Sequence, residues 1–172
     1  MIAGGYSSAI CLAAAQAAAR YGIAFVVDLG AADSIVERGL GNTFRFGPGH
    51  RVVVPQALFQ LRAVNSAAGD PAGSVMIVHE VSRLGTAMSG VLTSELPALG
   101  FEAVDIAAHS SGARDFGPIV SRIKAAQPDV LIVKSGYDES ARCCRSAATR
   151  RLPSAARSGR VARAHADPLA AV

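Results

Sequence analysis

Short apolar blocks alternate with longer segments of helical composition along most of the chain. Three of the blocks are continuous and rich in β-branched residues, namely Ile23–Val27, Ser74–His79 and Val130–Val133. Such runs are typical of parallel strands that are covered on both faces. Strands alternating with helices of ten or more residues predict right-handed β-α-β units. The expected fold is therefore α/β, a three-layer parallel sheet with helices on both faces.

The first unit of this pattern begins near the N-terminus. Ser7 and Ser8 are N-cap candidates before the alanine-rich run 9–20, and the strand 23–27 follows that helix closely. In open α/β sheets, ligands lie outside the carboxyl ends of the strands, where helix N-termini offer free N–H groups to an anion. We therefore expect Ser7, Ser8 and the loop residues 29–32 to share one crevice.

Further along, the pattern predicts elements of both kinds around one strong break. Helical spacing covers residues 51–68, although Pro55 indicates that the helix proper begins there. The turn Gly69–Gly73 is the strongest turn signal, and we expect a lobe boundary near it. Other expected elements are a helical turn at 34–39, strands at 43–46 and 101–106, helices at 86–99 and 116–126, and a helical start after residue 139.

Composition and charge narrow the function classes. The chain has 172 residues, of which 51% are hydrophobic, and it contains no tryptophan, so it is long enough for one packed, aliphatic core. The net charge of +4 is uneven, because residues 142–172 carry seven arginines against one aspartate. No aromatic residues are interleaved with those arginines. Nucleic-acid binding is therefore not predicted.

Away from the strand ends, the sequence contains few residues or motifs that indicate a metal, cofactor or membrane site. Cys11 and the adjacent pair Cys143 and Cys144 predict three free thiols rather than a disulfide framework or a metal cage. No export signal is visible at Met1, and no apolar run approaches the ~20 residues of a membrane span. Neither a Gly-x-Gly-x-x-Gly motif nor a P-loop lysine motif occurs, so no cofactor is expected.

An enzyme is the weaker interpretation. His79 and Glu80 end a buried strand and, with a serine, would suit hydrolysis, but no Gly-x-Ser-x-Gly elbow accompanies them. His79 is more often a core or loop histidine in such a position. His50 and His109 have no partners at the spacing of metal ligands. We therefore predict neither a catalytic site nor a metal site.

Several blocks occur together in the order known from one family. They are GGYSSA, then YGIAFVVDLGAADSIVERG with FRFGPG, then SVMIVHE with LG, then ARDFGPIVSRIKAAQPDVLIV. Over roughly residues 1–149 the chain resembles the type I periplasmic (extracytoplasmic) solute-binding proteins of the leucine/isoleucine/valine-binding type, which serve ABC transporters. The resemblance implies a periplasmic location, a permease partner in the membrane, no cofactor, and a small carboxylate or amino acid captured between two α/β lobes.

The resemblance also implies binding positions, which we carry over one at a time. Ser8, with Ser7 beside it, matches the helix-start serine that takes the ligand carboxylate. Leu29 and Ala31 match the loop that holds the carboxylate and the ammonium group. Ala31 stands where the family often has a threonine.

From the second lobe, the resemblance implies two positions. Leu84 stands where an aromatic residue often closes the pocket, and Tyr137 matches a second-lobe tyrosine. The acidic residue that usually pairs with the ligand's ammonium group would lie beyond Arg150. Family members usually begin with an export signal and two further β-α units. We therefore expect incomplete lobes, weak ligand binding and self-association.

The expected organisation has three parts and leaves alternatives open. Residues 1–70 are assigned to part of the first lobe with the carboxylate-binding helix start, and residues 71–149 to part of the second. Residues 150–172 are expected to be a basic, low-complexity tail, non-native or disordered. The alternatives are a ligand-sensing regulatory domain of the same fold and a non-functional gene fragment.

Overall fold

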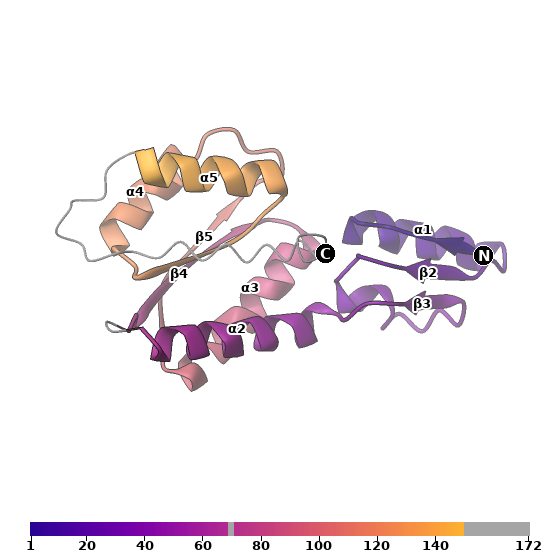
Figure 1. The fold of residues 1–172 in the computed structure, drawn as a ribbon. Coiled ribbons are helices and arrows are strands. Elements are labelled where there is room, and N and C mark those ends of the chain that lie inside the picture. The colour runs from indigo at the N-terminus through magenta and orange to yellow at the C-terminus, as the bar shows by residue number, and fades with distance from the viewer. Residues whose placement is uncertain (69–70, 150–172) are drawn as a thin grey trace, which may run out of the picture.

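The computed structural model describes residues 1–68 and 71–149 and arranges them around two sheets (Figure 1). The first sheet has the strand order β1-β2-β3, and the second has the order β5-β4-β6. Every strand pair is parallel. The strands are β1 Ile2–Ala3, β2 Phe25–Val27, β3 Thr43–Arg45, β4 Ser74–Glu80, β5 Glu102–His109 and β6 Val130–Lys134. The predicted α/β fold with parallel strands flanked by helices is confirmed, divided between two sheets.

The first sheet is covered by one long helix. Helix α1, Ser8–Arg20, places Cys11, Ala15 and Ala18 in a core with Phe25 and Val27 of β2. A short 3-10 helix, η1 Asp33–Ile35, follows β2 and closes this core with Ile35. We call the first sheet with α1 and η1 the first lobe.

The second sheet is packed on both faces. Helices α4, Gly117–Ala126, and α5, Tyr137–Thr149, cover one face, and α2, His50–Ser66, and α3, Arg83–Glu95, cover the other (Figure 1). A 3-10 helix, η2 Pro97–Leu99, follows α3. Side chains of β4 alternate between the two cores, which explains why its sequence is apolar at nearly every position. We call the second sheet with α2 to α5 the second lobe.

Helix α2 connects the two lobes, and its start differs from the sequence-based expectation. The prediction that the helix proper begins at Pro55 is wrong, because α2 begins at His50 and contains Pro55. The carbonyl of Gly49 accepts hydrogen bonds from Val52 N–H and Val53 N–H, at 3.0 Å each, which form the first turn before the proline. Pro55 lacks one N–H and so removes one hydrogen bond without ending the helix.

The packing of α2 bears on where the chain passes between the lobes. Val54 and Leu58 of α2 are buried with Val75 and Ile77 of the second sheet. The chain therefore passes from the first sheet to the core of the second sheet at the start of α2. The sequence analysis expected this boundary near residue 70. The assignment of residues 1–70 and 71–149 to separate lobes stays a prediction. The predicted tail, 150–172, lies outside the described residues.

Two properties of the described residues bear on the function classes. Within residues 1–68 and 71–149, no helix has the length and apolar character of a membrane span. Cys11, Cys143 and Cys144 are free thiols, and all three are buried.

Candidate ligand-binding cleft

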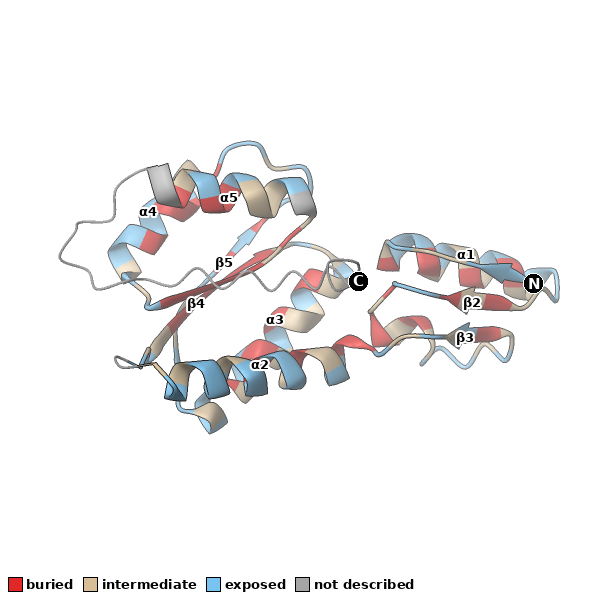
Figure 2. Ribbon diagram, viewed as in Figure 1, coloured by how far each residue is buried: buried red, intermediate tan, exposed pale blue. Residues whose placement is uncertain are grey.

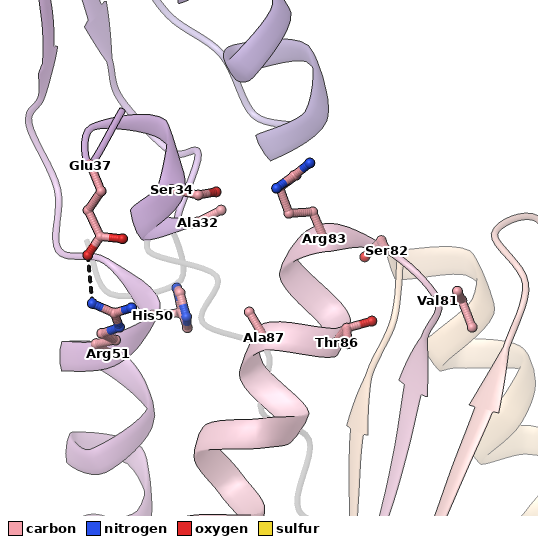
Figure 3. Close-up of a pocket in the computed structure, with 10 residues that line it drawn as sticks. All are labelled: Ala32, Ser34, Glu37, His50, Arg51, Val81, Ser82, Arg83, Thr86 and Ala87. Atoms are coloured by element: carbon pink, nitrogen blue, oxygen red, sulfur yellow. Dashed lines mark hydrogen bonds and ion pairs between the residues drawn. The ribbon is translucent and has the colours of Figure 1, made fainter. Parts of the chain in front are cut away.

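A cleft of about 650 Å³ lies between the two lobes (Figure 3). One wall comes from the segment that follows β2 and from the start of α2, and the other comes from the loop after β4 and the first turns of α3. The lining residues are Ala32, Ser34, Glu37, His50, Arg51, Val81, Ser82, Arg83, Thr86 and Ala87. Both walls follow the carboxyl ends of parallel strands, which is where α/β folds bind their ligands.

Ser8 joins the start of α1 to the cleft wall. Its buried hydroxyl accepts a hydrogen bond of 3.2 Å from the N–H of Ala32, a lining residue. Ser7 is the N-cap of α1, but its side chain makes no capping hydrogen bond. The helix start and the strand-end loop thus lie together, although neither serine lines the cleft itself. Their role as ligand contacts stays a prediction.

The other predicted binding residues lie around the cleft without lining it. The side chain of Leu29 is exposed, and Leu84 packs against the core of the first lobe. The carbonyl of Ala31 accepts a hydrogen bond of 2.8 Å from His50 N–H. Tyr137 begins α5, and its side chain lies outside the described part of the structure. The structure thus places Ala31 and Leu84 next to lining residues and leaves their ligand contacts untested.

A cluster of polar side chains that the sequence analysis missed anchors the first-lobe wall. Oδ1 of Asp33 accepts a hydrogen bond of 2.6 Å from Nη2 of Arg45. Oδ2 of Asp33 accepts one of 3.1 Å from the N–H of Arg51 and lies 3.2 Å from Nδ1 of His50. The side chains of Asp33, Arg45 and His50 are only 9%, 12% and 7% exposed. These contacts fix the start of α2 against the loop that follows β2.

The cluster lowers the pKa of the Asp33 carboxyl group and leaves no room for a side chain at position 49. Burial alone would raise the pKa of Asp33, but the hydrogen bonds from Arg45 and Arg51 and the nearby charges outweigh it and lower this pKa below 3.8. A side chain at Gly49 would collide with the carboxylate of Asp33 and the guanidinium of Arg45. The sequence Gly47-Pro48-Gly49 indicates a break in the chain, but it does not indicate which side chains pack against Gly49.

The wall from the second lobe is formed where α3 begins, shortly after the end of β4. Ser82 is the N-cap, and its Oγ accepts a hydrogen bond of 3.0 Å from Gly85 N–H. A side chain at Gly85 would collide with the carbonyl oxygen of Glu80, so the helix can approach the strand end only with glycine there. The expected start of this helix at residue 86 is therefore wrong. The capped turn places Arg83 and Thr86 on the cleft wall.

The histidines at the strand ends of the second sheet bond within the protein. Nε2 of His109 lies 2.5 Å from Oγ of Ser135, and the ring packs edge-on against Phe116 at 5.1 Å between centroids. His79 is buried, with Nδ1 3.0 Å from the carbonyl of Glu80. Neither arrangement presents an exposed nucleophile. Among residues 1–68 and 71–149, no group of three or more His, Cys, Asp or Glu side chains is placed to hold a metal ion.

The chain was compared with models of known protein families. A family model described as "Periplasmic binding protein" matches residues 1–157, which is most of the chain. No functionally curated protein matched.

Several solved structures with a similar fold are described as ABC transporter solute-binding proteins. An amino acid ABC transporter substrate-binding protein from Pseudomonas fluorescens Pf-5 matches with a TM-score of 0.75 and 20% identity over 87% of this chain and 39% of that one. A solute-binding protein from Rhodopseudomonas palustris BisB5, in complex with 3,4-dihydroxybenzoic acid, matches with a TM-score of 0.74 and 20% identity. The match covers 95% of this chain and 42% of that one. An ABC transporter substrate-binding protein from Desulfitobacterium hafniense, in complex with Leu, matches with a TM-score of 0.66 and 15% identity. The match covers 84% of this chain and 43% of that one. The chain thus spans about two fifths of the length of these proteins.

Proposed function

The chain belongs to the periplasmic binding protein family, and on that premise we propose that it forms part of the substrate-binding component of an ABC transporter. In this role it captures a small carboxylate between two α/β lobes for uptake. The structural neighbours of this family member are ABC transporter solute-binding proteins, not enzymes.

The position of the cleft is the observation that carries the proposal. Both of its walls follow strand ends, β2 on one side and β4 on the other, and each wall includes the first turn of a helix. Its volume of about 650 Å³ falls within the range of roughly 300–1,000 Å³ usual for small-molecule sites. A ligand bound there would contact both lobes at once, as uptake by lobe closure requires.

The class of ligand follows from the chemistry that the neighbours share. Leu and 3,4-dihydroxybenzoic acid, named for two neighbours, both carry a carboxylate. The resemblance of the sequence favours a branched-chain amino acid held by Ser7, Ser8, Leu29 and Ala31 from the first lobe and by Leu84 and Tyr137 from the second. We propose the carboxylate as the common feature, and the amino acid as the first candidate to test.

The partner and the location follow from the same premise. A solute-binding component delivers its ligand to a membrane permease, and we propose such a permease as the partner of the complete protein. Because the matched family is one of periplasmic binding proteins, we propose the periplasm as the location of the complete protein. Neither proposal calls for a nucleic acid or a cofactor.

The test is a titration of the 172-residue chain with leucine, benzoate and 3,4-dihydroxybenzoate, followed by NMR, which detects millimolar affinity. We expect binding in the millimolar range, near −4 kcal/mol, because the chain spans only about two fifths of the solute-binding proteins that it matches and so offers a ligand only part of their two lobes. Shifted signals should come from both walls of the cleft. No saturable binding of any of the three acids would contradict the proposal.

Ser8→Ala tests the predicted helix-start contact. Losing a hydrogen bond to a charged group costs about 1.5–3 kcal/mol, so we expect affinity to fall at least tenfold. Ser121→Ala, which changes an exposed serine on α4 outside the cleft, is the matched control. Because Ser8 also bonds Ala32, the melting temperature of each variant is recorded. A folded Ser8→Ala chain with unchanged affinity removes Ser8 from the site.

A further inference from the structure

His50, the first residue of α2, lines the cleft with one of its two ring nitrogens unpaired. Its side chain is only 7% exposed. Every contact of the ring with a polar group of the described structure involves Nδ1, and Nε2 has none. Among the described residues, only Oγ of Ser34 and Oγ1 of Thr43 are both unpaired and shielded from solvent. The unpaired Nε2 is therefore accessible, and the space that His50 borders is the cleft.

The surroundings of Nδ1 determine what Nε2 can do. Asp33 N–H donates a hydrogen bond of 3.2 Å to Nδ1 and has no other acceptor in the described structure. Two oxygens also lie near Nδ1, but each already accepts another hydrogen bond. The carbonyl of Ala31 accepts from His50 N–H, and Oδ2 of Asp33 accepts from Arg51 N–H. With Nδ1 as acceptor the neutral ring carries its proton on Nε2, and a charged ring carries one there as well. Nε2 is thus a hydrogen-bond donor in either state.

The other polar groups of this wall are already bonded within the protein. The first two N–H groups of α2 donate to the segment that follows β2, so the helix N-terminus itself is not free for a ligand. The carboxylate of Asp33 is paired with Arg45, and that of Glu37 with Arg51. Neither carboxylate is left unpaired to repel an anion. The ring of His50 is therefore the donor that this wall offers.

The position of the ring suits a contact with a ligand in the cleft. Figure 3 shows His50 on the side of α2 that faces α3, with the side chain of Ala87 directed toward it from the other wall. A donor that lacks an acceptor in a nearly buried side chain is unfavourable once a ligand displaces water from the cleft. A carboxylate oxygen would supply that acceptor.

We propose that His50 is a ligand contact of the first-lobe wall, and that its Nε2–H donates a hydrogen bond to an oxygen of the ligand carboxylate. This inference rests on the proposed capture of a small carboxylate and adds a residue that the family resemblance does not name. Nδ1 of the same ring bonds Asp33, so the ring connects the ligand to the cluster that fixes the start of α2.

Two substitutions separate the roles of the two nitrogens. His50→Asn keeps an amide oxygen near the place of Nδ1, where it can accept from Asp33 N–H, but has no group that reaches the place of Nε2. His50→Gln returns an amide N–H to the place of Nε2. In NMR titrations of the 172-residue chain we expect benzoate affinity to fall roughly tenfold in His50→Asn and less in His50→Gln. A purely structural role would give the opposite order, because asparagine preserves the bond to Asp33.

The ring of wild type gives a second readout, which decides the matter if a variant fails to fold. The nitrogen NMR signal of His50 Nε2 should shift as benzoate is added and should saturate with the same Kd as the backbone signals of the cleft. The ring signals of His79 and His109, which bond within the protein, are internal controls and should not move.

The outcomes distinguish this inference from the proposed function. If backbone signals of the cleft shift while Nε2 of His50 does not, or if His50→Asn binds benzoate as tightly as wild type, His50 is not a ligand contact while capture of a carboxylate stands. If wild type binds none of leucine, benzoate and 3,4-dihydroxybenzoate, the proposed function fails and the inference fails with it.

Discussion

The two lobes hold their sheets in different ways. The strands of the second sheet have five to eight residues and lie between two cores, one under α4 and α5 and one under α2 and α3. The strands of the first sheet have two or three residues and pack against a single core under α1. Buried apolar area is the main source of stability, so the second lobe should be the more stable of the two.

The difference is clearest on the face of the first sheet that points away from α1. Ala3, Val26 and Phe44 are neighbours in the register of the three strands and share that face. Phe44 is 55% exposed, and Phe46, just beyond β3, is 89% exposed. Figure 2 shows the contrast between the sheets, because β4 is drawn almost wholly as buried whereas β3 carries an exposed stretch. Parallel sheets are normally covered on both faces. The first lobe therefore depends more on its connection to α2, which the cluster around Asp33 provides.

Breaking that connection should have the largest effect on the comparison. Asp33→Ala leaves Arg45 buried without its partner, and removing one member of a buried ion pair costs about 3 kcal/mol or more. We expect the first lobe to lose its protection from hydrogen exchange while β4 and β6 keep theirs. Gly49→Ala, which displaces the same carboxylate, should reproduce the effect.

Asp28→Ala is the matched control. Asp28 follows the end of β2, as Asp33 does, but its side chain is exposed, and the one hydrogen bond that its carboxylate makes in the described structure comes from the N–H of its neighbour Leu29. It should leave both lobes unchanged. Equal loss of protection in the two lobes of Asp33→Ala would show that they unfold as one unit.

The same carboxylate should give the first lobe a pH dependence. The pKa of Asp33 is lowered in the folded state, so its contribution is fully present above its unfolded value, near 3.8, and is lost as the pH falls through the folded value. The melting temperature of wild type should therefore fall more steeply than that of Asp33→Asn as the pH drops from 5 toward 3. If the melting temperatures of the two proteins fall in parallel with pH, the carboxylate of Asp33 is not the source of the pH dependence.

Covering or changing the open face of the first sheet should have a smaller effect. Exposed apolar side chains on an uncovered sheet favour association of two chains. The double variant Phe44→Ser and Phe46→Ser should weaken self-association about tenfold, measured by analytical ultracentrifugation. Phe59→Ser, at an exposed phenylalanine of α2, is the control for a general loss of surface hydrophobicity. An equal change in both variants would mean that the open sheet face is not the contact.

The sequence predicted the second lobe better than the first, for a physical reason. The runs of β4 and β6 are apolar because both faces are buried, and this pattern is visible without any partner. The cluster of Asp33, Arg45 and His50 joins residues up to 17 positions apart, and no periodicity marks it. The sequence placed Ser8 at a helix start, where α1 begins, while its contact with a ligand stays a prediction.

The most direct test of the account uses the cysteines as probes of the two lobes. Cys11 lies in the core of the first lobe and Cys143 in that of the second, and both are fully buried. Burial raises the pKa of Cys11, helped by the charge of Asp28, and burial, with Cys144 adjacent, raises that of Cys143 to about 11. Neither thiol should react before its lobe opens.

The measurement is the rate at which a thiol reagent modifies each cysteine, located by mass spectrometry, with and without benzoate. We predict that Cys11 reacts before Cys143, and that benzoate slows the reaction of Cys11 because a ligand bound in the cleft contacts both walls and ties the first lobe to the second. Prior reaction of Cys143, or a rate for Cys11 that benzoate leaves unchanged, would contradict the claim that the ligand is held between two lobes of unequal stability.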